Sequence, residues 1–284
     1  MESVETSAAP PGPGAGRLIS RRVREMFRVY PKALVGDVEA VHDLRVAARR
    51  LRAAVLLLAD DPEARRARRT DRTLGELARA AGRGRDLDVG IEILESMPAA
   101  ASEENERLRR ALRASRSRAR SLSREALLDL GVAHLRRDLR SLVATSHVDR
   151  EVLNLRLAVL RLREEQTIES ALARGRARPG PEQLHRARRA ARRLRYAAEI
   201  DGLFGGADSD APNRWRAMQN RLGDIQDRHV LALWLSLRER RAEARGDLLL
   251  AAAAHRTLLR VERDAARRAR EFLAERTAAK DPPA

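Results

Sequence analysis

The stretch Val41–Ala54 reads VHDLRVAARRLRAA, and it recurs 143 positions later as Leu184–Ala197, LHRARRAARRLRYA. Nine of the fourteen aligned positions are identical without a gap, and His42 aligns with His185. Composition alone does not account for this match, even in a chain so rich in Arg and Ala. A spacing this long indicates two copies of one module, because solenoid repeats recur every 20–50 residues or so.

Both stretches are predicted to form amphipathic helices. At about 100° per residue, cationic and imidazole side chains gather on one side of each helix, and apolar side chains gather on the other. We call the first set the signature stripes: His42, Arg45, Arg49 and Arg52 in the first copy, and His185, Arg188, Arg192 and Arg195 in the second. A solvated face normally mixes signs, since like charges at i,i+4 oppose each other. The stripes carry no carboxylate, which favours an anion-binding surface.

A second pair of matching segments follows the stripes. Residues 81–89 read AGRGRDLDV, and residues 222–230, 141 positions later, read LGDIQDRHV. The first segment has two carboxylates, Asp86 and Asp88, whereas the second keeps Asp227 but has His229 in place of the other. We expect Asp86 and Asp227 to cap the N-termini of helices rather than to bind a divalent metal.

The two motifs together, H-x-x-R-x-x-x-R-R-L-R and L-G-x-x-R-D-x-x-V, resemble those of the conserved histidine α-helical domain (CHAD) family. The resemblance runs from about Arg17 to Thr277, and His229 departs from it. It implies an all-α fold of two pseudo-symmetric antiparallel four-helix bundles. It also implies non-catalytic binding of inorganic polyphosphate on the basic surface and association with polyphosphate granules.

Composition agrees with a helical, anion-binding protein. Aromatic residues make up only 2% of the 284 residues, so the core is expected to consist of Leu, Val and Ala side chains between closely packed helices. The net charge of +17 indicates a polyanionic partner: nucleic acid, polyphosphate or an anionic membrane. Of the 58 basic residues, 56 are arginines, whose planar guanidinium binds phosphate in a bidentate manner.

The chain contains no cysteine, which excludes disulfides and Cys-based zinc sites and favours a cytoplasmic location. Residues 1–16 lack the features of a signal peptide and are predicted to be a disordered tail, as are residues 279–284. We expect an N-terminal half at 17–145 and a C-terminal half at 146–278. No apolar run approaches the ~20 residues of a membrane span.

Local signals also predict helix ends. Pro31 should end a helix that begins at Arg17, and Asp37 should cap the first signature helix. A helix from Ser102 to about Ser141 should break near residues 121–123, and the GRARPGP segment at 175–181 should be a loop. Asp227 should begin a new helix.

The predicted site is a set of basic and phosphate-bonding side chains. The polyphosphate-binding residues are expected to be His42, Arg45, Arg49, Arg50, Arg52, His185, Arg188, Arg189, Arg192, Arg193, Arg195 and Tyr196, with additional contacts from Arg17, Arg21, Arg24 and Arg28. Nearby positive charge should favour the neutral form of both signature histidines, which suits hydrogen bonding to phosphate; a packing role at the helix start is the alternative. No catalytic residue, metal ligand or cofactor is expected.

Two rival functions remain open. One is nucleic-acid binding, against which stand the few aromatic residues and the absence of Asn or Gln from the stripes. The other is an enzyme that hydrolyses or transfers phosphate. Such an enzyme needs a nucleophile or metal constellation, and the chain has no HExxH, P-loop or G-x-S-x-G motif. The sequence does not determine the oligomeric state.

Overall fold

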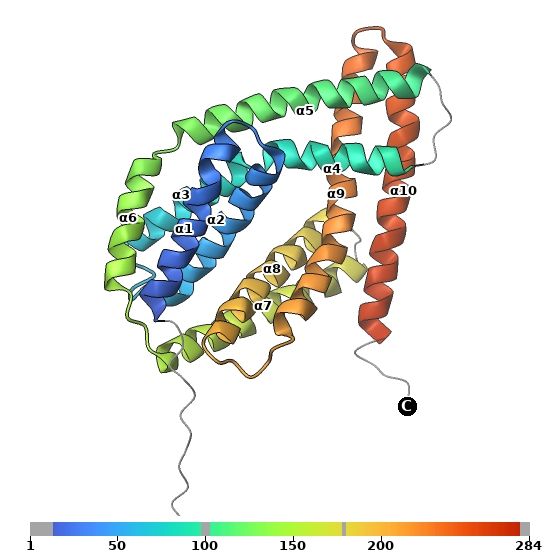
Figure 1. The fold of residues 1–284 in the computed structure, drawn as a ribbon. Coiled ribbons are helices and arrows are strands. Elements are labelled where there is room, and N and C mark those ends of the chain that lie inside the picture. The colour runs from blue at the N-terminus through green and yellow to red at the C-terminus, as the bar shows by residue number, and fades with distance from the viewer. Residues whose placement is uncertain (1–13, 98–102, 178–179, 279–284) are drawn as a thin grey trace, which may run out of the picture.

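The computed structural model describes residues 14–97, 103–177 and 180–278. Within these ranges every regular element is a helix, so the predicted all-α class is confirmed (Figure 1). The helices are α1 (Ala15–Leu34), α2 (Val38–Leu58), α3 (Arg65–Ala80), α4 (Arg83–Ser96), α5 (Glu103–Asp129), α6 (Val132–Thr145), α7 (Arg150–Ala177), α8 (Pro181–Leu203), α9 (Ala211–Glu243) and α10 (Leu248–Ala278). The predicted tails lie outside the described residues, apart from residues 14–16, where α1 already begins.

The two signature stretches form α2 and α8. The Asp37 carboxylate accepts a hydrogen bond of 2.8 Å from the Ala40 amide, which confirms the predicted cap of α2. Pro181 occupies the first turn of α8, where its missing N–H costs nothing. The apolar faces of both helices are buried, as Leu51 and Leu194 illustrate. The predicted amphipathicity of both helices is therefore confirmed.

The hydrophobic interior divides into three cores. One lies mainly among α1, α2, α3 and α6, and another joins α7 and α8 to parts of α9 and α10. Between them, α4 and α5 of the N-terminal half pack against α9 and α10 of the C-terminal half (Figure 1). The two halves thus share a core, while the pseudo-symmetry of two four-helix bundles stays a prediction.

Several helix ends differ from those predicted. Helix α1 continues through Pro31 to Leu34, because the buried Ala33 holds the last turn against the core. Helix α5 passes through the serines at 121–123 and ends at Asp129 before Gly131. Helix α7 extends to Ala177, into the segment predicted to be a loop.

The two acidic motifs also behave differently from the prediction. Helix α9 runs without a break through Gly223 and Asp227, so Asp227 caps nothing. In the N-terminal half the chain does break, between α3 and α4, but Gly82 is the N-cap and Asp86 lies inside the first turn. N-capping by these two aspartates is therefore wrong, and both carboxylates instead face signature arginines. No helix in the described ranges is long and apolar enough to cross a membrane.

Candidate functional site

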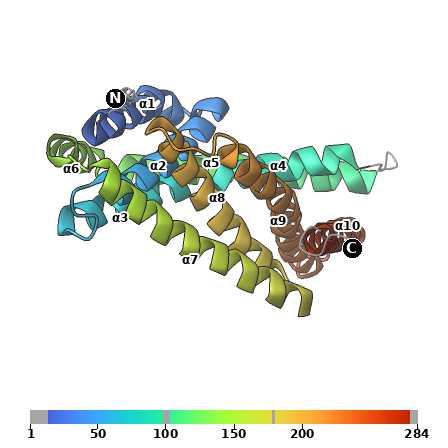
Figure 2. The same ribbon diagram turned by 90° about the horizontal axis from the view of Figure 1, so that it is seen from below.

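A groove of about 790 Å³ is lined mainly by α2, α3 and α8. Figure 2 shows α8 near the middle of the molecule, with α2 beside it. We call this groove the central groove. Its charged and hydroxyl-bearing lining consists of Arg45, Arg49, Arg52, Asp71, Glu76, Arg79, Asp86, His185, Arg188, Arg189, Arg192, Arg193 and Tyr196. The structure thus brings residues of both signature stripes into one cavity.

Arg49 and Arg192 are the two arginines of the central groove whose pKa values are lowered most. No carboxylate among the described residues lies within 4.0 Å of either guanidinium. Burial, followed by the charges of Arg192 and Arg45, lowers the pKa of Arg49 to about 9. Burial, with Arg188 and Arg45 as the main repelling charges, lowers the pKa of Arg192 to about 10. Each remains charged at neutral pH, in a groove that would be stabilised by an anion.

Arg45 and Arg188 occupy equivalent positions in the repeat and have equivalent partners. Arg45 pairs with Asp86 at 3.3 Å, and Arg188 pairs with Asp227 at 3.5 Å. Burial raises the pKa of Asp227, and Arg188 opposes this shift. These two pairs replace the helix caps that the sequence suggested.

The two signature histidines lie in different surroundings. His185 lines the central groove and is half-buried, and burial together with the charges of Arg189 and Arg188 lowers its pKa. Its neutral form is therefore favoured, as the sequence predicted. His42 is exposed and does not line the groove.

Three other predicted residues form ion pairs with carboxylates that are largely shielded from solvent. Arg50 of α2 donates from Nε and Nη2 to Glu199 of α8, at 2.9 and 3.3 Å. The same carboxylate lies 3.4 Å from Nε of Arg195, one turn earlier in α8. Neither arginine lines the central groove, and the Arg50–Glu199 pair instead ties α2 to α8. Arg193 does line it, and pairs with the buried Glu164 of α7.

Tyr196 and the α1 arginines differ in their relation to the groove. Tyr196 lines it, although only 5% of the residue is exposed, and the Arg195 guanidinium lies 4.6 Å from the ring centroid. The four predicted arginines of α1 are exposed on that helix and are not brought to the groove. They are Arg17, Arg21, Arg24 and Arg28.

Sequence reasoning missed the wall that α3 contributes. Asp71 accepts two hydrogen bonds from Arg52, at 2.7 and 2.8 Å, and Arg79 adds a guanidinium without a carboxylate partner among the described residues. Asp71, Gly75 and Arg79 follow one another at intervals of four, which places them on one face of α3. That spacing was the available signal, but α3 has so many arginines that no single one stood out.

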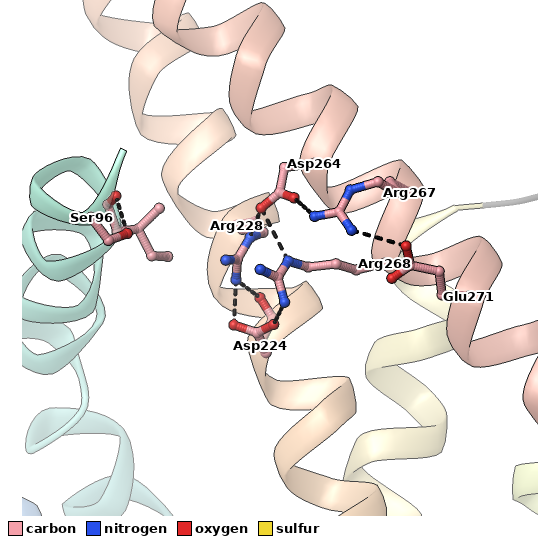
Figure 3. A network of polar contacts seen from close by, with 8 residues as sticks. Ser96, Asp224, Arg228, Asp264, Arg267, Arg268 and Glu271 are labelled. Atoms are coloured by element: carbon pink, nitrogen blue, oxygen red, sulfur yellow. Dashed lines mark hydrogen bonds and ion pairs between the residues drawn. The ribbon is translucent and has the colours of Figure 1, made fainter. Parts of the chain in front are cut away.

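A second cleft, of about 640 Å³, lies between α4 and α10 and is also lined mainly by arginines. Figure 3 shows Asp264 accepting from Arg228, Arg267 and Arg268, while Asp224 accepts from Arg228 and Arg268. Burial opposes the shift, but the hydrogen bonds from these arginines lower the pKa of Asp264 to about 2. This network stabilises the packing of α9 on α10, whereas Arg49 and Arg192 of the central groove have no carboxylate partner among the described residues.

No group of three or more His, Cys, Asp or Glu side chains in the described part of the chain is arranged to hold a metal ion. The potential metal ligand Asp88 instead pairs with Arg120 of α5 at 2.8 Å. The cationic central groove is therefore the main candidate site.

The model of the CHAD domain family matches residues 17–236. The chain belongs to the CHAD family. The match spans both signature stripes, so the resemblance drawn from the paired motifs is confirmed. A crystal structure of the CHAD domain from the plant Ricinus communis is similar at 21% identity with a TM-score of 0.57, over 99% of this chain and 92% of that one. This likeness extends the CHAD fold over the whole chain. No curated protein matches this chain.

Proposed function

We propose that the central groove binds inorganic polyphosphate and that the protein does not catalyse its turnover. The observation that carries this proposal is the meeting of Arg49 and Arg192 without a carboxylate. Their lowered pKa values reflect like-charge repulsion and burial, both of which a phosphate would offset. Because one arginine comes from each half, a linear polyanion along the groove contacts both stripes at once, and binding to one strengthens binding to the other.

The groove suits a bare chain of phosphates better than a nucleic acid. Among the described residues, Tyr196 is the only Phe, Tyr or Trp in the lining, and it is buried, so these residues offer no platform on which bases stack. Asn and Gln, which read base edges, are absent from the same set of lining residues. Guanidinium groups bind phosphate oxygens in a bidentate manner, and these oxygens are all that polyphosphate presents.

The absence of catalysis is part of the same proposal. His185 is the one histidine in the lining, and none of the described carboxylates lies within ion-pair distance of it. A neutral imidazole in this position donates a hydrogen bond to phosphate without activating a nucleophile. Incubation of the purified protein with polyphosphate and magnesium or manganese should release no phosphate. Release that disappears in His185→Ala would favour the enzyme instead.

A titration with polyphosphate, with DNA and RNA as competitors, tests binding. Arg49→Ala with Arg192→Ala should weaken affinity by roughly tenfold to a few hundredfold, since charge-assisted hydrogen bonds contribute about 1.5–3 kcal/mol each. The matched control, Arg137→Ala with Arg140→Ala, removes the same charge from the exposed face of α6, outside the groove. Equal losses in both variants would mean that net charge holds the polymer, and nucleic acid would then be the better candidate.

Association with polyphosphate granules belongs to this proposal too. A fluorescent fusion of the wild-type chain should gather on granules in cells that accumulate polyphosphate. The Arg49→Ala, Arg192→Ala variant should be dispersed, whereas the α6 control should still gather there.

A further inference from the structure

Three arginines of the central groove lie directly against glycines of a facing segment. A Cβ at Gly82 would lie 3.4 Å from Cζ of Arg45, and one at Gly223 would lie 3.1 Å from Nη2 of Arg188. A third arginine repeats the arrangement, since a Cβ at Gly75 would lie 3.2 Å from Nη1 of Arg52. At Gly75 and Gly223 the guanidinium is the nearest group, at a distance tighter than most Cβ contacts, so a side chain there would displace it. At Gly82 the Arg79 carbonyl oxygen, at 3.2 Å, would lie nearer to the added Cβ than Arg45 does.

An aspartate stands four residues from each of these glycines. Asp86, Asp227 and Asp71 pair with the arginine that lies against Gly82, Gly223 and Gly75 respectively, at 3.3, 3.5 and 2.7 Å. At this spacing the glycine and the aspartate share one helical face. We call each such unit, a glycine and an aspartate that together hold an arginine, an arginine cradle.

Two of the three cradles occupy equivalent places in the internal repeat. Gly82 and Asp86 align with Gly223 and Asp227, although one pair lies at the break between α3 and α4 and the other inside the continuous α9. The same contacts therefore form on two different backbones. This recurrence points to a function for the contacts themselves rather than to a by-product of local helix geometry.

Burial limits what the cradled arginines can do. The side chains of Arg45 and Arg188 are only 18% and 22% exposed, and the Nε atom of each is buried without a hydrogen-bond partner among the described residues. Both residues line the central groove. Their Nη groups are therefore the donors left for a ligand, and the direction of those groups depends on the cradle.

We propose, on the basis of the proposed function, that Asp86 and Asp227 are positioning residues for polyphosphate. Each carboxylate binds one edge of a guanidinium. The glycine lacks the Cβ that would keep the guanidinium plane away from the helix. The remaining N–H groups therefore face the groove. Pre-orientation of this kind lowers the entropy lost when the ligand binds. The aspartate of the L-G-x-x-R-D-x-x-V motif thus positions the first arginine of the H-x-x-R-x-x-x-R-R-L-R motif.

The positioning role and simple electrostatics predict opposite changes in polyphosphate affinity when the two aspartates are neutralised. Two carboxylates in an anion-binding groove repel phosphate, so their neutralisation would strengthen binding if charge alone mattered. If the aspartates position Arg45 and Arg188, their neutralisation weakens binding although the net charge becomes more positive.

The experiment is a polyphosphate titration of the full chain carrying Asp86→Asn and Asp227→Asn, at several salt concentrations. We expect roughly tenfold weaker binding and a log affinity–log salt slope that is shallower by about 1–2, because about two phosphate contacts are lost. The control carries Asp208→Asn and Glu275→Gln, which pair with the exposed arginines Arg214 and Arg221 away from the groove. It adds the same charge, and its affinity should stay level or rise.

Gly223→Ala is the second variant, because it displaces the Arg188 guanidinium without changing any charge. The glycine variant should also weaken polyphosphate binding. If the asparagine variant fails a thermal-melting check of its fold, the glycine variant takes its place in the comparison with the control. Unchanged or tighter binding by the folded variant would overturn the positioning role. If wild-type protein fails to bind, or Arg49→Ala with Arg192→Ala binds equally well, the proposed function itself fails, which separates the two failures.

Discussion

Arg49 and Arg192 both line the central groove, where burial and the charge of Arg192 lower the pKa of Arg49 to about 9 in the folded protein. Because this folded value lies below the ordinary value of an unfolded arginine, the charged side chain disfavours folding at every pH below about 9. That penalty fades only as the pH rises above about 9 towards the ordinary arginine pKa. At neutral pH, therefore, the charge of Arg49 weakens the fold.

Neutral replacements of these two arginines should separate stability from binding. We expect Arg49→Met with Arg192→Met to stabilise the fold by on the order of 2 kcal/mol, since a fraction of the two pKa depressions reaches this size at about 1.36 kcal/mol per unit. The melting temperature should rise by roughly 4–8 °C while polyphosphate affinity falls as in the alanine variant. A melting temperature that falls would mean that the two charges are already compensated in the free protein.

At the residue level, the sequence predicts which side chains share a face of a helix, because helical geometry alone decides this. Arg45, Arg49, Arg188 and Arg192 share one face by their spacing, and all four line the groove. Arg50 failed as a groove residue because its partner, Glu199, lies 149 positions away, and no local pattern reports such a pair. The contribution of Arg79 was hidden for the same reason, since only the packing of α3 brings it to the groove.

Among the helices, α2 and α8 are joined by one carboxylate in addition to their apolar contacts in the first core. The side chain of Glu199 is 12% exposed and pairs with both Arg50 and Arg195. Its removal would leave the buried Arg195 and the partly buried Arg50 without that partner.

Glu199→Ala should therefore destabilise the protein by about 3–5 kcal/mol, the usual cost of breaking a buried ion pair from one side. Urea denaturation measures this loss. Glu275→Ala breaks an exposed pair with Arg221 and should cost far less than Glu199→Ala. Similar costs for both substitutions would show that Glu199 is not a tie between the helices.

At the level of elements, the sequence predicted helices well and their ends less well. Pro31 and Asp227 carry strong local signals for a helix end and a helix start, yet both lie inside helices. Burial outweighed the local signal in each case: Ala33 is packed in the first core, and α9 places Ile225 in one core and Leu231 in another. A helix shared between two cores gains more from continuity than from a cap.

At the scale of the whole molecule, the shared core makes the halves depend on each other. Ile93, Leu108 and Leu112 of α4 and α5 pack against α9 and α10. A fragment containing only residues 1–146 leaves these side chains in water, at about 25 cal/mol per Å² of apolar surface.

In such a fragment, α4 and α5 should not hold their native structure. Their backbone amides should exchange with solvent far faster than in the whole chain, as hydrogen exchange can measure residue by residue. Helices α1 and α2, which pack in a different core, supply the internal comparison. Full protection of α4 and α5 in the fragment would mean that the N-terminal half is an independent domain.

Because one signature stripe lies on each wall of the central groove, the position of both stripes in one polypeptide decides whether the site survives dilution of the protein. Sites that form between separate subunits vanish when the protein is scarce, because mass action takes the subunits apart. Here α2 and α8 belong to one polypeptide and are joined by the Arg50–Glu199 pair. Both walls therefore stay together at any protein concentration, and a single molecule carries a complete groove.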